Sequence, residues 1–203
     1  QKKKESGNVE FDKGLAWLTD NALSVLDFGC GSGTALFLCN KYGTDTHIGI
    51  DLSPQAIKSA IEKSKMIENG NFQFLCGGIE ALKGIQDESM DSAILSNIID
   101  NLYPDDAISV LEEIKRILRK NGKLLVKLNP FISDEQIEEY GIKKISGNLL
   151  DDGMILWNNT NEEWEDILGA RYSISDYVEI YYEESGQINS CLLYTSPSPR
   201  DTR

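Results

Sequence analysis

A glycine-rich turn between a strand-like run and a helix-like run restricts the fold of this chain more than any other feature. Residues 24–28 are SVLDF, a short β-prone run, and residues 29–33 are GCGSG. Apolar residues then recur over residues 34–41 with the spacing of a buried helix. Glycines clear side chains from a place where a ligand approaches the backbone, and the N–H groups at a helix start point toward that ligand. The sequence therefore predicts a strand, a ligand-binding turn and a helix.

The rest of the chain predicts strands and helices in alternation. Strands are expected at residues 24–28, 47–51, 72–76, 92–95, 123–128 and 178–182, with a seventh beginning at residue 187. Helices are expected at residues 11–18, 34–41, 53–68 and 105–119, the last of them ended by Asn121 and Gly122. This order predicts an α/β fold, Rossmann-like, with a mostly parallel sheet and helices on both of its faces.

The overall composition excludes several classes of protein. A net charge of −13 argues against nucleic-acid partners, because a protein that neutralises phosphates needs a basic face. No apolar run approaches the ~18 residues of a membrane helix, so we expect a cytoplasmic location. The four cysteines are too few for a disulfide scaffold and form no CxxC pair, so we expect reduced thiols and no metal site.

Both ends of the chain have unusual sequences. Residues 191–203 resemble translated read-through of a sequencing adapter, and we expect this tail to be non-native. The last natural strand is then expected to be truncated. Gln1 in place of an initiator methionine suggests that the other end is also clipped.

An acidic residue follows the second expected strand at an informative distance. Asp51 lies 18 residues after Gly33, close to the ~20 residues expected for an acid that binds ribose hydroxyls. The pair indicates a ligand that contains adenosine. The dinucleotide pattern GxGxxG would place its third glycine at Thr34, so the spacing argues against a nicotinamide-dependent oxidoreductase.

Three blocks of sequence resemble class I S-adenosylmethionine-dependent methyltransferases. The first is residues 25–33, VLDFGCGSG, and the second is residues 49–53, GIDLS. The third is residues 112–124, EEIKRILRKNGKL, which resembles the helix, turn and fifth strand of that family. The resemblance covers roughly residues 12–130. It implies a single cofactor-binding domain over residues 1–190, with residues 12–130 as its core and residues 131–171 as an insertion on the acceptor side.

The resemblance implies cofactor-binding roles at the first strand. Asp27 would help to hold the ammonium group of the methionine portion of S-adenosylmethionine. Gly29, Gly31 and Gly33 would line that portion.

Further cofactor contacts are implied at the second and third strands. Asp51 would accept hydrogen bonds from the ribose, and Leu52 would pack on adenine. Gly78 stands where the family commonly has an aspartate for the adenine amino group, so the backbone around Ile79 is left to bind that ring. Glu80 is expected to be a solvated residue at a helix start, with ligand contact as the alternative.

The segment after the fourth strand is where the family places residues between the cofactor methyl and the acceptor. Asn97 is counted with the cofactor site, and Asp100 and Tyr103 are weak candidates for catalysis. The alternative for Asp100 and Asn101 is that they begin the next helix. The single histidine, His47, starts the second strand at the other end of the sheet, so no histidine base is expected.

The segment between the fifth and sixth strands contains two ambiguous features. Asn129-Pro130-Phe131 resembles the Asn-Pro-Pro-Phe/Tyr motif of amino-methyltransferases, but it lacks the second proline and follows the fifth strand instead of the fourth. In the insertion, Trp157 is a candidate to face a substrate, and Trp164 is expected to pack in a helix. Burial in the core is expected for both tryptophans, and a position facing the substrate is the alternative for Trp157.

The expected function is methyl transfer from S-adenosylmethionine to an unidentified small-molecule acceptor. A non-catalytic S-adenosylmethionine-binding partner module is the main alternative, because Gly78 departs from the family pattern and a nearby histidine is missing. The sequence specifies neither the acceptor atom nor the oligomeric state.

Overall fold

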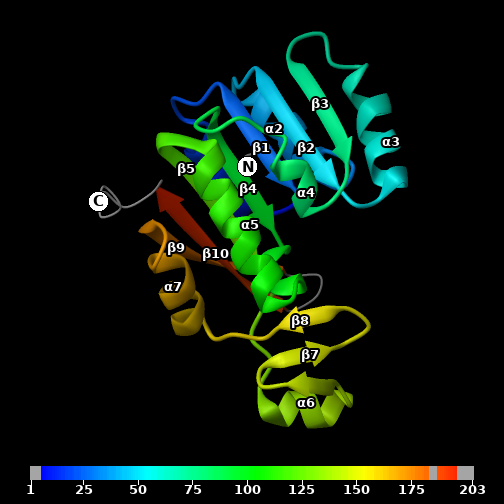
Figure 1. Cartoon of the computed structure of the whole chain (residues 1–203), viewed down its shortest axis with the longest axis vertical. Helices are drawn as coiled ribbons and strands as arrows, with labels where there is room; N and C mark the ends of the chain where they lie inside the picture. The colour runs from blue at the N-terminus through cyan, green and yellow to red at the C-terminus, as the bar shows by residue number, and fades with distance from the viewer. Residues whose placement is uncertain (1–5, 183–186, 196–203) are drawn as a thin grey trace.

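The structure is a computed structural model that describes residues 6–182 and 187–195. Its centre is a seven-stranded sheet of order β3-β2-β1-β4-β5-β10-β9 (Figure 1). The strands are β1 (Ser24–Phe28), β2 (Thr46–Asp51), β3 (Asn71–Cys76), β4 (Met90–Ser96), β5 (Leu118–Leu128), β9 (Ser173–Tyr182) and β10 (Gln187–Thr195). Strands β1 to β5 pair in parallel, and β10 is antiparallel to both β5 and β9. The predicted Rossmann-like α/β fold is confirmed.

Helices cover both faces of the sheet, because side chains along each strand alternate between two apolar clusters. The helices are α1 (Val9–Thr19), α2 (Thr34–Lys41), α3 (Pro54–Ser64), α4 (Ile79–Leu82), α5 (Pro104–Ile117) and α7 (Asn161–Gly169). On one face, Val25 and Ile94 pack with residues of α1, α2 and α3. On the other, Leu26 and Leu95 pack with α4, α5 and α7. Each fully buried aliphatic side chain of this kind contributes about 1.5–3 kcal/mol.

Residues between β5 and α7 form a small unit beside the main sheet (Figure 1). It consists of α6 (Asp134–Tyr140) and a three-stranded antiparallel sheet of β6 (Lys143–Ser146), β7 (Leu149–Asp151) and β8 (Ile155–Trp157). The Asn158 side chain accepts the N–H of Ile132 at 2.9 Å and donates to its carbonyl at 2.8 Å. The two ends of the unit therefore lie side by side, and we refer to this double hydrogen bond as the Asn158 clamp.

The boundary between α5 and β5 differs from the prediction. The helix ends at Ile117 and the strand begins at Leu118, which pairs with Met90. Asn121 and Gly122 were expected to end the helix, but they lie inside the strand, where Asn121 has a φ of +63°. The β4–β5 register shifts between Met90 and Ser92, so the turn-forming pair produces an irregularity within the ladder.

Other boundaries differ by a few residues. Helix α3 ends at Ser64 instead of residue 68, and β9 begins at Ser173 instead of residue 178. Strand β10 continues to Thr195, five residues into the tail with the adapter-like sequence. Residues 196–203 lie outside the described residues.

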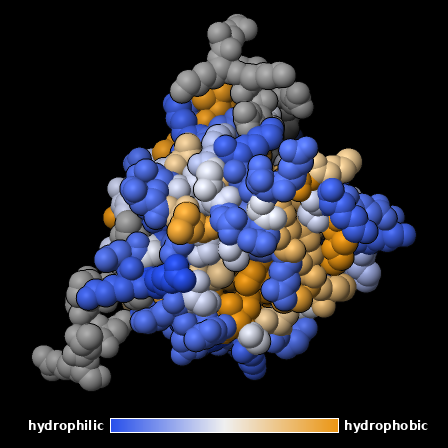
Figure 2. Space-filling view, turned by 90° about the horizontal axis from the view of Figure 1, so that it is seen from above, coloured by the Kyte–Doolittle hydropathy of each residue, from blue (hydrophilic) through white to orange (hydrophobic). Residues whose placement is uncertain are grey.

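The surface is largely polar, in keeping with the net charge of −13. The face in Figure 2 is mostly hydrophilic, with hydrophobic side chains in smaller patches. Within the described ranges, every helix falls short of the length and apolar character needed to cross a membrane.

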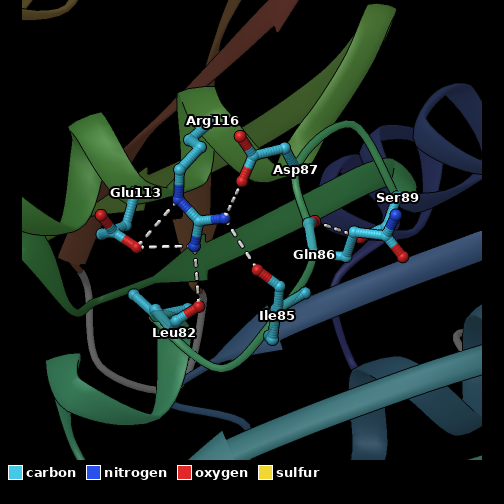
Figure 3. Close-up of polar contacts among 7 residues, drawn as sticks. All are labelled: Leu82, Ile85, Gln86, Asp87, Ser89, Glu113 and Arg116. Carbon is cyan, nitrogen blue, oxygen red and sulfur yellow. Dashed lines mark hydrogen bonds and ion pairs between the residues drawn. The ribbon is translucent and has the colours of Figure 1, made fainter.

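One arginine connects α5 to the segment between α4 and β4 (Figure 3). Arg116 donates to the carbonyls of Ile85 and Leu82 at 2.7 and 2.9 Å, and it pairs with Glu113 and Asp87. Its side chain is 28% exposed. The planar guanidinium binds these four groups at once, which the single ammonium of lysine cannot do.

We expect Arg116→Lys to lower the free energy of unfolding by about 1–3 kcal/mol, because two carbonyls and a carboxylate lose charge-assisted hydrogen bonds. Urea unfolding measures the change. The matched control is Arg119→Lys, since Arg119 is about half exposed and its ion pair with Asp91 lies at the surface. An equal loss in both variants would contradict a special role for the Arg116 cluster.

Candidate functional site

The described buried side-chain atoms that lack a hydrogen-bond partner point to one edge of the main sheet. They are Asp27 Oδ1, Asp100 Oδ1 and Asn159 Nδ2. Asp27 is near the carboxyl end of β1, and Asp100 is in the 3-10 turn η1 (Ile99–Asn101) that follows β4. Asn159 follows β8, which lies against η1. Unsatisfied buried groups are costly and uncommon, so this edge is the candidate site.

The glycine turn after β1 has a conformation that needs glycine. Gly29, Gly31 and Gly33 have φ values of +82°, +52° and +82°. The N–H groups of Gly29 and Cys30 donate to the carbonyl of Ile50 at 2.7 and 3.0 Å, which fixes the turn against β2. A Cβ at Gly29 would overlap the side chain of Ile98, which comes from the end of β4. The turn therefore packs closely against a neighbouring strand end.

Asp51 connects this turn to the start of α3. Its Oδ2 accepts the N–H of Gly31 at 2.8 Å, and its Oδ1 accepts the N–H of Ser53 at 2.8 Å. Ser53 in turn caps α3 through a hydrogen bond from Ala56. The carboxylate is thus fixed by backbone donors from two loops at adjacent strand ends.

Asp27 lies beneath the same turn and is only 3% exposed. It pairs in register with Gly49, so it shares a sheet face with Asp51, two residues farther along β2. Burial, and then the charge of Asp51, raises the pKa of the Asp27 carboxyl to about 7. The structure brings Asp27, the three glycines and Asp51 together.

The residues that follow β2 and β3 lie together and are partly exposed. Leu52 is 74% exposed, and its Cδ2 lies 3.4 Å from where a Cβ of Gly78 would be. The half-buried Ile79 begins α4, and Glu80 accepts the N–H of Gly78 at 2.8 Å. That hydrogen bond lowers the pKa of Glu80. Glu80 therefore lies exposed at a helix start, as expected.

Three asparagines form a ring at the ends of β4 and β5. Asn97, with a φ of +55°, donates through its side chain to Asn129 Oδ1 at 2.9 Å. Asn129 donates to Asn101 Oδ1 at 3.3 Å, and Asn101 donates back to the Asn97 carbonyl at 2.9 Å. We refer to this arrangement as the asparagine ring.

The two weak candidates for catalysis lie in different environments. Asp100 is 1% exposed, and its Oδ2 accepts the N–H of Asn129 at 2.6 Å. Burial raises the pKa of Asp100, although the Asn129 N–H opposes the shift. Tyr103, the residue before α5, is 52% exposed. Asp100 and Asn101 lie in the 3-10 turn, ahead of the helix that they were alternatively expected to begin.

The two tryptophans of the insertion pack against each other. Their ring centroids are 5.0 Å apart at an angle of 70°. Trp164 is 2% exposed in the core, which confirms its packing in a helix. Trp157 is half-buried at the end of β8, the strand that lies against η1.

The histidine and the described cysteines differ in position and in exposure. His47 is buried at the start of β2, where its ring nitrogens bond to Thr44 and to the Asn71 carbonyl. Cys30 and Cys39 are buried free thiols, whereas Cys76 is exposed. Among the described residues, no group of His, Cys, Asp and Glu has an arrangement that could hold a metal ion.

Sequence reasoning missed the asparagine ring. Asn129 was considered only through a motif that it does not match, and Asn101 only as part of a helix start. The position of Asn129 directly after a parallel strand is the signal that could have identified it, because such ends line the ligand edge of α/β sheets.

Comparison with known proteins shows the family to which this chain belongs. Residues 19–163 match the family described as "Methyltransferase domain". The ribosomal protein L11 methyltransferase of Thermosipho melanesiensis is 32% identical over 104 residues, which are 51% of this chain and 37% of the relative. The same-named protein of Burkholderia vietnamiensis is 55% identical over 42 residues, 21% of this chain and 14% of the relative. The chain therefore matches well under half the length of these relatives.

Solved structures agree on the fold. A structure of S-adenosylmethionine-dependent methyltransferases from Methanosarcina mazei has a TM-score of 0.71 at 19% identity, covering 86% of this chain and 92% of that one. The 1,6-didemethyltoxoflavin-N1-methyltransferase of Burkholderia thailandensis, solved with S-adenosylhomocysteine, has a TM-score of 0.74 at 18% identity, covering 96% and 80%. The chain belongs to the methyltransferase-domain family and has the class I fold of S-adenosylmethionine-dependent methyltransferases.

Proposed function

We propose that this chain transfers a methyl group from S-adenosylmethionine to a small-molecule acceptor. The observation that carries the proposal is the position of Asp51, fixed by the N–H groups of Gly31 and Ser53 at the ends of adjacent parallel strands. A rigid carboxylate beside a glycine turn suits the hydroxyls of a ribose. The unpartnered Oδ1 of Asp27 suits the ammonium of the cofactor.

The remaining cofactor contacts follow from the same edge. Gly29, Gly31 and Gly33 would leave room for the methionine portion. The exposed Leu52 would cover adenine, and the backbone around Ile79 would bind the edge of that ring.

The protein's part in the reaction is alignment and exclusion of water. When bound, the cofactor supplies an electrophilic methyl group on a sulfonium. Asn97 would lie between cofactor and acceptor. Asp100 is too buried to meet the acceptor and would act as a positioning residue by holding Asn129 in the asparagine ring. Tyr103 is exposed and would assist an acceptor that must lose a proton.

The acceptor side would be completed by the insertion. Residues 131–171 place β8 and the half-buried Trp157 beside η1, and we assign them to acceptor recognition within one domain of residues 1–190. The two relatives described above are named ribosomal protein L11 methyltransferase, a name that specifies a protein acceptor. A screen that detects S-adenosylhomocysteine formation with small-molecule and ribosomal-protein fractions tests this part. Turnover confined to the protein fraction would overturn it, and cofactor binding with no turnover would favour a non-catalytic module.

A thiol beside the proposed adenine surface reports on cofactor binding. Exposed Cys76 has its sulfur 3.7 Å from the Leu52 carbonyl. We expect S-adenosylhomocysteine at ten times its Kd to slow alkylation of Cys76 by N-ethylmaleimide about tenfold. At that concentration only about one-tenth of the protein is without ligand and can react. Peptide mass spectrometry measures the rate. NADH serves as the control ligand, and protection by NADH alone would favour the oxidoreductase alternative.

A further inference from the structure

The carboxyl group of Asp27 occupies an unusual position for an acid. It is 3% exposed, its Oδ1 has no hydrogen-bond partner, and it forms no ion pair with any described residue. An ionised carboxylate in such a place loses its hydration without a compensating partner, which costs several kcal/mol. The group therefore favours its protonated, neutral form unless a cation is supplied.

The described side chains around Asp27 offer no such cation. Asp51 on β2 adds a negative charge, and two backbone N–H groups hold that charge in place. Cys30 in the turn and Cys39 on α2 also face Asp27, and burial raises the pKa of both thiols, so they stay neutral. Lys63 of α3 reaches the same turn, but its ammonium donates to Ser32 at 2.9 Å.

The two carboxyl groups at this site, Asp27 and Asp51, therefore differ in their hydrogen-bond partners. The Asp51 carboxylate accepts two backbone N–H groups, whereas Oδ1 of Asp27 accepts none. The raised pKa of Asp27, about 7, agrees with this geometric argument.

We propose that Asp27 holds a proton while the cofactor site is empty and releases it to solvent when the ammonium of the cofactor binds. The proposal rests on the proposed function, since it needs the methionine portion to lie at Asp27. The O–H bond of the carboxyl breaks, the proton passes to water or buffer, and the carboxylate pairs with the ammonium. No electrons are transferred.

Because binding releases the proton of Asp27, the affinity for the cofactor depends on pH. The empty site is mostly protonated below about pH 7, so binding must displace a proton there and weakens as the pH falls. If the ion pair holds the bound carboxyl ionised, affinity falls about eightfold from about pH 7.5 to about pH 6. A ligand without an ammonium gains nothing from the ionised carboxyl. Asp27 would thus select for ligands that carry the amino-acid end of the cofactor.

Calorimetric titration tests the proposal on the whole chain. S-adenosylhomocysteine is titrated at about pH 6.5 in phosphate and in imidazole, whose ionisation enthalpies differ, so the difference in heat counts the protons released. We expect somewhat under one proton for each ligand bound. The matched ligand is 5′-methylthioadenosine, which keeps the adenosine and the thioether but lacks the ammonium, and we expect it to release none.

The variant Asp27→Asn keeps the size of the side chain but cannot ionise. We expect its proton release to disappear and its affinity for S-adenosylhomocysteine to become flat from about pH 6 to about pH 7.5. Binding without proton release in the parent chain, or equal release with both ligands, would overturn the proposal. These parent-chain outcomes decide it even if the variant does not fold. Failure of both ligands to bind would instead overturn the proposed function.

Discussion

Asp51→Ala is expected to weaken binding of S-adenosylhomocysteine by about 100-fold or more, because the change removes the proposed hydrogen bonds from two ribose hydroxyls to a charged acceptor. Each such bond contributes about 1.5–3 kcal/mol. The change also releases the N–H groups of Gly31 and Ser53, so the glycine turn loses one of its connections to α3. Calorimetry at fixed pH gives the ratio of Kd values.

The control for this change is Asp51→Asn. Its amide oxygen can still accept one backbone N–H and one ligand hydroxyl, so we expect an intermediate loss. Thermal unfolding of the empty variants separates damage to the fold from damage to binding. Equal affinity of Asp51→Ala and the parent chain would refute the ribose-binding role of Asp51.

Trp164→Ala is expected to lower the free energy of unfolding by about 3–5 kcal/mol, since it leaves a large cavity in the core. Trp164 is 2% exposed and packs edge-to-face on Trp157. A loss of this size is a large part of the ~5–15 kcal/mol that stabilises an ordinary domain. Urea unfolding followed by circular dichroism measures it.

The matched change Trp157→Ala should cost less, because Trp157 is only half-buried. The double variant completes a cycle, and we expect about 0.5–1.5 kcal/mol of coupling between the two rings. If Trp157→Ala were as costly as Trp164→Ala, then Trp157 would be a core residue and its assignment to the acceptor side would fail.

The glycine turn and the position of Asp51 beside it could be predicted, because local sequence and strand order determine them. The run from Asp27 to Gly33 joins a short strand to a helix, and the positive φ values at three glycines follow from that tight turn. Strand order then places Asp51 beside it, since β1 and β2 are parallel neighbours.

The insertion and the start of β5 could not be predicted in the same way. Strands β7 and β8 have three residues each, too short for an alternating pattern to stand out. Asn121 and Gly122 form a typical helix-ending pair, yet pairing of Leu118 with Met90 draws the preceding residues into the sheet. The asparagine ring depends on side chains from two strand ends, which no local pattern relates.

The Asn158 clamp has a consequence for how such a protein can diversify. Because Ile132 and Asn158 are hydrogen-bonded to each other, the chain leaves and re-enters the domain at almost one point. Lengthening or replacing the segment between Ile132 and Asn158 costs little, because the entropic cost of loop closure grows only by about 0.6 kcal/mol for each doubling of loop length. Under the proposed function, the range of acceptors can therefore change by exchange of this segment, while the cofactor site proposed at β1 and β2 stays the same.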